Sequence, residues 1–130
     1  MNVKTKILVV DDDVKFTETL RDLLEVEGYD AHAIYSGYEA LERVKKEKFD
    51  ILLMDIKMPV MNGIEVLQEI KKMTPRPVVI LMTGFTVEDL VKDAIKEGAV
   101  AVLYKPLDIP QLLQRLDTVR SVAMRGMNNE

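Results

Sequence analysis

The segment ILLMDIKMPVMNG, residues 51–63, determines how the rest of the chain is interpreted. Its first four residues are apolar, the run ends at Asp55, and Pro59, Asn62 and Gly63 follow as turn residues. Because a short, continuously apolar run is typical of a strand covered on both faces, residues 51–54 are predicted to form a buried parallel strand. Burying a carboxylate without partners costs several kcal/mol, so Asp55 must have partners or a function for its charge.

The composition predicts one globular domain. The chain has 130 residues, of which 48% are apolar and 31% are charged, as is ordinary for globular proteins. The net charge of −4 and the lack of a basic run argue against non-specific binding to nucleic acid. No apolar stretch approaches the roughly 20 residues of a membrane helix, and the apolar run near the N-terminus is too short for a signal peptide. The absence of cysteine excludes disulfides and thiolate metal sites, so we expect a cytoplasmic protein.

Five short apolar runs are predicted to be strands, and amphipathic helical patterns lie between and after them. The runs are KILVV (6–10), DAHAI (30–34), ILLM (51–54), VVILM (78–82) and AVAVLY (99–104). The run around His32 alternates, which favours an edge strand with one wet face. The helical faces are marked by Phe16 and Leu20, by Leu41 and Val44, by Val66 and Ile70, by Leu90 and Ala94, and by Leu112 and Leu116.

Helix start signals agree with these patterns. They are Asp13 before Val14, Ser36 with Glu39, Asn62 with Glu65, Thr86 with Asp89, and Asp108 with Pro110. Alternation of five strands with five helices predicts a single doubly wound (βα)5 domain of the α/β class, with a five-stranded parallel sheet and helices on both faces. We place this domain at residues 3–124 and expect residues 125–130 to form a short C-terminal tail.

Polar residues follow four of the predicted strands. Asp11, Asp12 and Asp13 follow the first strand, Asp55 ends the third, Thr83 the fourth and Lys105 the fifth. Open parallel sheets bind ligands beyond the carboxyl ends of their strands, and adjacent strands are about 4.8 Å apart. These side chains are therefore expected to meet in one shallow cleft, whereas Asp13 is better explained as a helix N-cap.

The chemistry of this cleft favours a phosphoryl acceptor. Clustered carboxylates repel one another unless one is protonated or a cation joins them, and an all-oxygen ligand set favours Mg²⁺. Lys105 adds a fixed positive charge, and Asp55 is then expected to stay ionised and exposed at neutral pH, as a nucleophile requires. A carboxylate beside Mg²⁺, an ammonium and the Thr83 hydroxyl is suited to attack phosphorus.

The motifs ILVVDDD, MDIKMPVMNG, LMTG and LYKP, in this order, resemble the receiver domain of two-component response regulators over residues 5 to 122. The resemblance implies a flavodoxin-like strand order 2-1-3-4-5 and phosphotransfer from a histidine kinase or histidine phosphotransfer protein with Mg²⁺. It also implies a phosphorylation-activated switch, rather than an enzyme, that controls dimerisation or effector binding through the fourth helix, fifth strand and fifth helix. No effector, and no surface for direct contact with nucleic acid or membrane, is expected in this chain.

Carried over by position, the resemblance makes Asp55 the phosphoacceptor, Thr83 the switch hydroxyl and Lys105 the phosphate-pairing residue. It assigns the metal site to Asp11, Asp12, Asp55 and the backbone carbonyl of Lys57. Pro106 resembles the proline that follows a cis bond in this family. Three residues before the lysine the family often has Tyr or Phe, but this chain has Val102, so we predict a switch carried mainly by Thr83 and the loop after it.

Three alternatives remain open from the sequence alone. The chain is either a stand-alone regulator or a receiver excised from a longer protein. A Mg²⁺-dependent phosphohydrolase with an aspartyl nucleophile would need a second aspartate two residues after Asp55, where Lys57 stands instead. A flavin-binding domain would need a phosphate-cradling loop after the first strand, where this chain has only acids.

Overall fold

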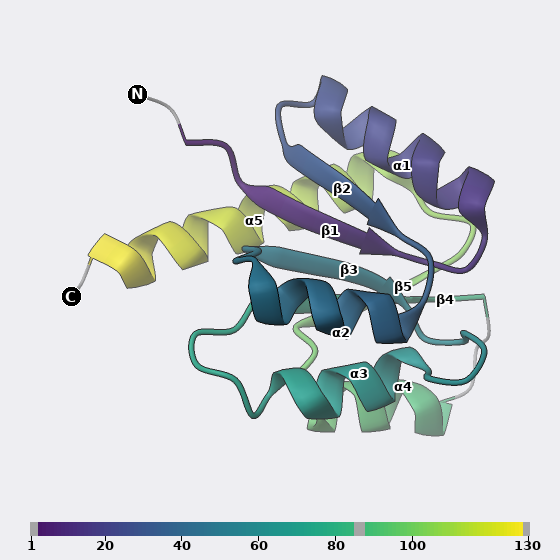
Figure 1. Ribbon diagram of the computed structural model, residues 1–130. Helices are drawn as coiled ribbons and strands as arrows, with labels where there is room; N and C mark the ends of the chain where they lie inside the picture. The colour runs from purple at the N-terminus through teal and green to yellow at the C-terminus, as the bar shows by residue number, and fades with distance from the viewer. Residues whose placement is uncertain (1–2, 85–87, 129–130) are drawn as a thin grey trace.

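The computed structural model describes residues 3–84 and 88–128 and shows five strands alternating with five helices (Figure 1). The elements in chain order are β1 (Lys6–Val10), α1 (Val14–Val26), β2 (Asp30–Ile34), α2 (Gly37–Lys46), β3 (Ile51–Asp55), α3 (Gly63–Ile70), β4 (Val78–Thr83), α4 (Glu88–Lys96), β5 (Ala101–Tyr104) and α5 (Ile109–Asn128). Each predicted apolar run forms a strand. The helix α5 continues beyond residue 124, where the sequence suggested a boundary.

The strands form one parallel sheet in the order β2-β1-β3-β4-β5, which confirms the predicted fold class and strand order. β3 lies at the centre, and all five of its residues are buried. β2 lies at one edge with His32 half-buried, as its alternating pattern predicted. The register pairs Val10 with Met54, so Asp11, which follows β1, and Asp55, which ends β3, lie at the same end of the sheet.

The helices cover both faces of the sheet (Figure 1): α1 and α5 pack on one face, and α2, α3 and α4 on the other. Because successive side chains of a strand point to opposite faces, β1 contributes Ile7 and Val9 to the first core, and Leu8 and Val10 to the second. Within the described residues, no helix combines the length and apolar character needed to cross a lipid bilayer.

Four of the predicted helix caps are formed. The Asp13 carboxylate accepts a hydrogen bond from the Phe16 N–H, the Ser36 hydroxyl from Glu39 N–H and the Asp108 carboxylate from Gln111 N–H. Asn62 and Glu65 form a complete capping box. The cap predicted at Thr86 lies outside the described residues.

The loop between β3 and α3 is held tightly against the end of β3. The Gly63 N–H donates to the Ile56 carbonyl at 2.7 Å, and a Cβ at position 63 would lie 2.5 Å from the Asp55 carbonyl oxygen and 3.0 Å from the Ile56 Cα. Val60 in the same loop has a φ of 68°, a left-handed conformation that is strained for a β-branched residue. The backbone that carries Asp55 is therefore fixed by close packing rather than by local preference.

This packing predicts the effect of Gly63→Ala. Alanine normally stabilises a helix relative to glycine, but here its Cβ meets backbone atoms that have no side-chain freedom to move. We expect the free energy of unfolding, measured by urea denaturation, to fall by about 1–3 kcal/mol. Gly84→Ala is the control, because a Cβ there meets nothing within 4 Å. Equal or greater stability of Gly63→Ala would contradict the close approach.

Candidate functional site

The turn between β1 and α1 places the first carboxylate of the site. Asp11 directly follows β1 and is 1% exposed, whereas Asp12 is exposed. One Asp11 carboxylate oxygen accepts from the Asp13 N–H at 3.0 Å, and the buried Thr17 hydroxyl donates to the Asp11 backbone carbonyl at 2.9 Å. The turn therefore fixes both the backbone and the side chain of Asp11.

Lys105 reaches these acids from the far edge of the sheet. Its Nζ atom donates to Asp11 Oδ2 at 2.6 Å and lies 3.5 Å from Asp55 Oδ1. Carboxylate oxygens of Asp11, Asp12 and Asp55 all lie within 4.8 Å of one another. The structure thus brings together four of the predicted site residues, which are separated by up to 94 positions in the sequence.

Asp55 is buried, so the expectation that it is exposed is wrong: the residue is 6% exposed because it ends the central strand of the sheet. Burial and the nearby charge of Asp11 raise the pKa of Asp55 to about 6, although Lys105 acts in the opposite direction. The Asp55 carboxyl is still mostly ionised at pH 7. Burial acts to lower the pKa of Lys105, but its hydrogen bond to Asp11 and the charge of Asp55 raise it overall, so Lys105 remains an ammonium.

The charge of this cluster fits a divalent cation. Lys105 pairs with two of the three carboxylates, Asp11 and Asp55, and all three carboxylates can reach one point with an oxygen. Oxygen donors alone are the ligand type that Mg²⁺ prefers. Asp11, Asp12 and Asp55 are therefore suitable side-chain ligands for Mg²⁺.

The positions of Thr83 and Lys57 follow from the strands that carry or precede them. Thr83 is fully buried at the end of β4, one position beyond Met82, which pairs with Asp55; its carbonyl accepts from the Lys105 N–H at 2.8 Å. The Lys57 side chain is exposed, and its carbonyl as a metal ligand stays a prediction. The peptide bond between Lys105 and Pro106 is cis.

Val102 occupies the position, three residues before Lys105, where the family often has an aromatic residue, and it differs in burial from Tyr104, the aromatic residue next to Lys105. Val102 is half-buried and packs against the core under α2, α3 and α4, whereas the neighbouring Tyr104 is 48% exposed.

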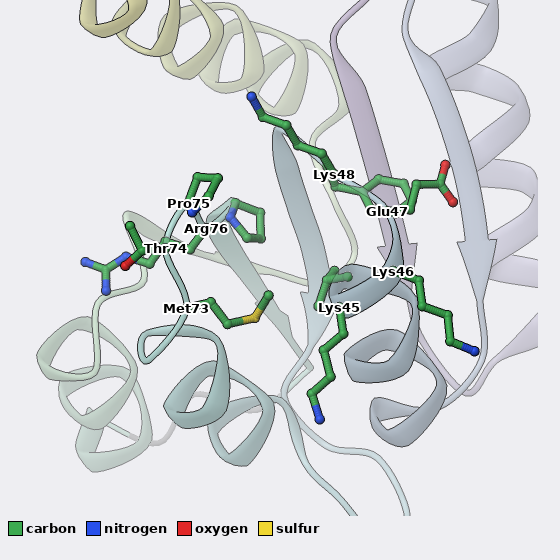
Figure 2. A pocket seen from close by; sticks show the side chains of 11 residues that line it. Lys45, Lys46, Glu47, Lys48, Met73, Thr74, Pro75 and Arg76 are labelled. Atoms are coloured by element: carbon green, nitrogen blue, oxygen red, sulfur yellow. The ribbon is translucent and has the colours of Figure 1, made fainter.

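A groove at the opposite end of the sheet is a weaker candidate. It has a volume of about 280 Å³ and lies between the segments that precede β3 and β4. Figure 2 shows that its cations, Lys45, Lys46, Lys48 and Arg76, point in different directions instead of converging. Its one acid, Glu47, is already paired with Lys6 and Arg43, which lower the pKa of its carboxyl to about 2. The carboxyl ends of the strands therefore hold the better-built site.

Two contacts of the site were not foreseen from the sequence. The first is the Thr17 hydroxyl, which also donates to the Asp13 carbonyl at 2.6 Å; a threonine four residues after an N-cap could have indicated this bond. The second is the Phe16 ring, whose centroid lies 4.6 Å from the Lys105 Nζ atom. The sequence places Phe16 only on a core-facing helix face, and no sequence pattern pairs it with Lys105, the residue that follows β5.

Comparison with known proteins identifies the class. Residues 7–117 match the model of the response regulator receiver domain. The chain therefore belongs to the receiver domain family of two-component response regulators, as the sequence motifs indicated.

Among curated relatives, the transcriptional regulatory protein ZraR of Salmonella typhimurium is 41% identical over 114 residues, which cover 88% of this chain and 26% of that protein. This chain thus spans about a quarter of the length of that relative. Sporulation initiation phosphotransferase F of Bacillus subtilis is 36% identical over 82% of this chain and 86% of that protein.

Solved structures agree with the fold. A CheY-like response regulator receiver domain protein from Methanospirillum hungatei has a TM-score of 0.91 and 29% identity, over 95% of this chain and 99% of that chain. The beryllofluoride-activated NtrC4 receiver domain dimer has a TM-score of 0.85 and 32% identity, over 92% of this chain and 98% of that chain.

The raised pKa of Asp55 predicts that its charge opposes folding when no metal is bound. Because the pKa is higher in the folded protein than the ordinary value of 3.8, stability falls as the pH rises from about 4 through about 6, and most of the loss has occurred by pH 7. We expect Asp55→Asn to raise the free energy of unfolding at pH 7 in EDTA by about 1–3 kcal/mol. Thermal denaturation against pH measures this. The difference in stability between the variant and the wild-type protein should vanish near pH 4. A variant less stable than the wild-type protein at pH 7 would contradict a raised pKa for Asp55.

Proposed function

We propose that this domain accepts a phosphoryl group on Asp55, with Mg²⁺ held by Asp11, Asp12, Asp55 and the Lys57 carbonyl, and acts as a phosphorylation-controlled switch. The observation that carries the proposal is the convergence of three carboxylates and the Lys105 ammonium at the carboxyl end of the sheet. Membership of the receiver family supports a histidine kinase or histidine phosphotransfer protein as the donor. It likewise favours signalling over enzyme turnover, and a cytoplasmic location.

The chain's own residues perform most of the transfer. Asp55 is mostly ionised at pH 7 and needs no general base, so one of its carboxylate oxygens attacks phosphorus while the bond from phosphorus to the donor nitrogen breaks. Lys105 pairs with a phosphoryl oxygen, and Asp11 keeps the ammonium in place beforehand through the 2.6 Å bond. Mg²⁺, when bound, supplies positive charge to the phosphoryl oxygens.

Phosphorylation replaces the Asp55 carboxylate by a group with more negative charge and three strong acceptors. Thr83 donates to one of these acceptors, and α4 is repositioned as Thr83 moves. The backbone bond from Lys105 N–H to the Thr83 carbonyl links this movement to the end of β5. Two or three charge-assisted bonds of about 1.5–3 kcal/mol each approach the roughly 5.5 kcal/mol needed for a nearly complete population shift.

The surface expected to respond consists of α4, β5 and α5, here called the output face. Ile95 on α4 and Tyr104 on β5 lie on it with 49% and 48% of their surface exposed. Exposed apolar side chains of this size favour a contact with a partner. The receiver domain of NtrC4, described as a dimer when activated by beryllofluoride, supports a homodimer as one such contact.

Phosphorylation is tested directly with acetyl phosphate and intact mass spectrometry. We expect one phosphoryl group per chain with Mg²⁺, little or none with EDTA, and none on Asp55→Asn. The control is Asp50→Asn at the other end of β3, whose carboxylate accepts the Lys6 N–H at 2.8 Å outside the site. An adduct that forms without Mg²⁺, or that persists on Asp55→Asn, would reverse the proposal.

The output face is tested by size-exclusion chromatography with beryllofluoride as the phosphoryl mimic. Ile95→Glu places a charge in the proposed apolar contact, so the beryllofluoride-induced dimer should weaken by about tenfold or more, while phosphorylation itself continues. Val26→Glu is the matched control, because Val26 is 84% exposed and lies on α1, which is not one of the three elements of the output face. A dimer that is equally sensitive to both substitutions would exclude the output face as its interface.

A further inference from the structure

We propose that Phe16 is a positioning residue for Lys105, a role that rests on the proposed function of the site. The centroid of the Phe16 ring lies 4.6 Å from the Lys105 Nζ atom, close enough for a cation–π interaction. The same ammonium donates to Asp11 at 2.6 Å and lies 3.5 Å from Asp55. The described contacts of the ammonium are thus two acids and one aromatic ring.

The Lys105 side chain needs a positioning contact because of where the residue lies in the sheet. It follows β5 at one edge, whereas Asp11 follows β1 and Asp55 ends β3, with β4 lying between β3 and β5. A lysine side chain has four flexible carbons and a strongly hydrated ammonium, so without fixed contacts it occupies many positions. The Lys105 side chain is 25% exposed, which leaves water access to compete with its partners.

Phe16 is itself held rigidly. Its backbone N–H donates to the Asp13 carboxylate at 3.1 Å, and its side chain packs against the core beneath α1 and α5. The next residue, Thr17, bonds through its hydroxyl to the Asp11 carbonyl at 2.9 Å. The ring and the Asp11 carboxylate therefore belong to one fixed turn, and the ammonium contacts both of them.

This geometry gives the ring two effects on Lys105. Its negatively polarised face attracts the ammonium, and its apolar surface excludes water from that side. Both effects keep Nζ near Asp11 and Asp55, where a phosphoryl oxygen arrives during transfer. A leucine at position 16 would preserve the apolar packing but not the attraction, whereas a tryptophan would preserve the attraction.

The test measures the rate of phosphorylation by acetyl phosphate with Mg²⁺, followed by intact mass. A small donor is used because it makes no protein contact with α1, so a changed rate cannot arise from donor docking. We expect Phe16→Leu to slow the reaction by about two- to thirtyfold, the range that cation–π energies imply. Phe16→Trp should restore the rate, and Leu23→Ala, a half-buried position of the same helix and core, should leave it unchanged.

The second part repeats Phe16→Leu in a Lys105→Met background. If Phe16 acts through Lys105, the substitution slows the wild-type protein but has no further effect without the ammonium. An equal slowing in both backgrounds would mean a structural effect of Phe16 and would overturn the inference. A wild-type protein that reacts no faster than Phe16→Leu would overturn it too, while a wild-type protein that forms no adduct would overturn the proposed function itself.

Discussion

The ion pairs that Lys105 makes with Asp11 and Asp55 determine the character of the site. Two buried carboxylates share one ammonium unequally, since Nζ lies 2.6 Å from Asp11 and 3.5 Å from Asp55. The raised pKa of Asp55 reflects this shortage of positive charge, because burial and Asp11 outweigh the effect of Lys105. Of these two carboxylates, Asp55 is therefore the one left short of positive charge, and a further cation beside it would be favourable. The same imbalance disfavours the folded state when no cation is bound.

The scaffold makes this unfavourable cluster possible by fixing the backbone around it. Asp55 ends a strand that is buried along its whole length, Gly63 packs directly against its carbonyl, and Thr17 holds the backbone of Asp11. The sheet lies between the core under α2, α3 and α4 and the core under α1 and α5. A change of charge at the carboxyl ends of the strands is therefore close to the ends of β1, β3, β4 and β5.

Much of this arrangement followed from the sequence, because the signals were local and repeated. Five apolar runs, the caps at Asp13 and Asn62, and the acids after β1 and β3 were sufficient to predict the strands, the parallel sheet and the gathering of Asp11, Asp12, Asp55 and Lys105. The sequence did not reveal the burial of Asp55, which depends on the neighbouring strands, or the contact between Phe16 and Lys105, which joins α1 to the end of β5. Such features depend on how elements pack in three dimensions, and hydrophobic periodicity carries no information about them.

The most direct test of the central idea is a titration of the isotope-labelled protein with Mg²⁺, monitored by amide chemical shifts in NMR. A shared divalent-cation site predicts saturable shifts that are largest at residues 11–12, 55–57 and 105, and that are lost together in Asp12→Asn. Shifts scattered over the surface, or centred on the acids near Lys6 and Arg43 at the other end of the sheet, would contradict the claim that these side chains form one metal-binding and phosphoryl-accepting site.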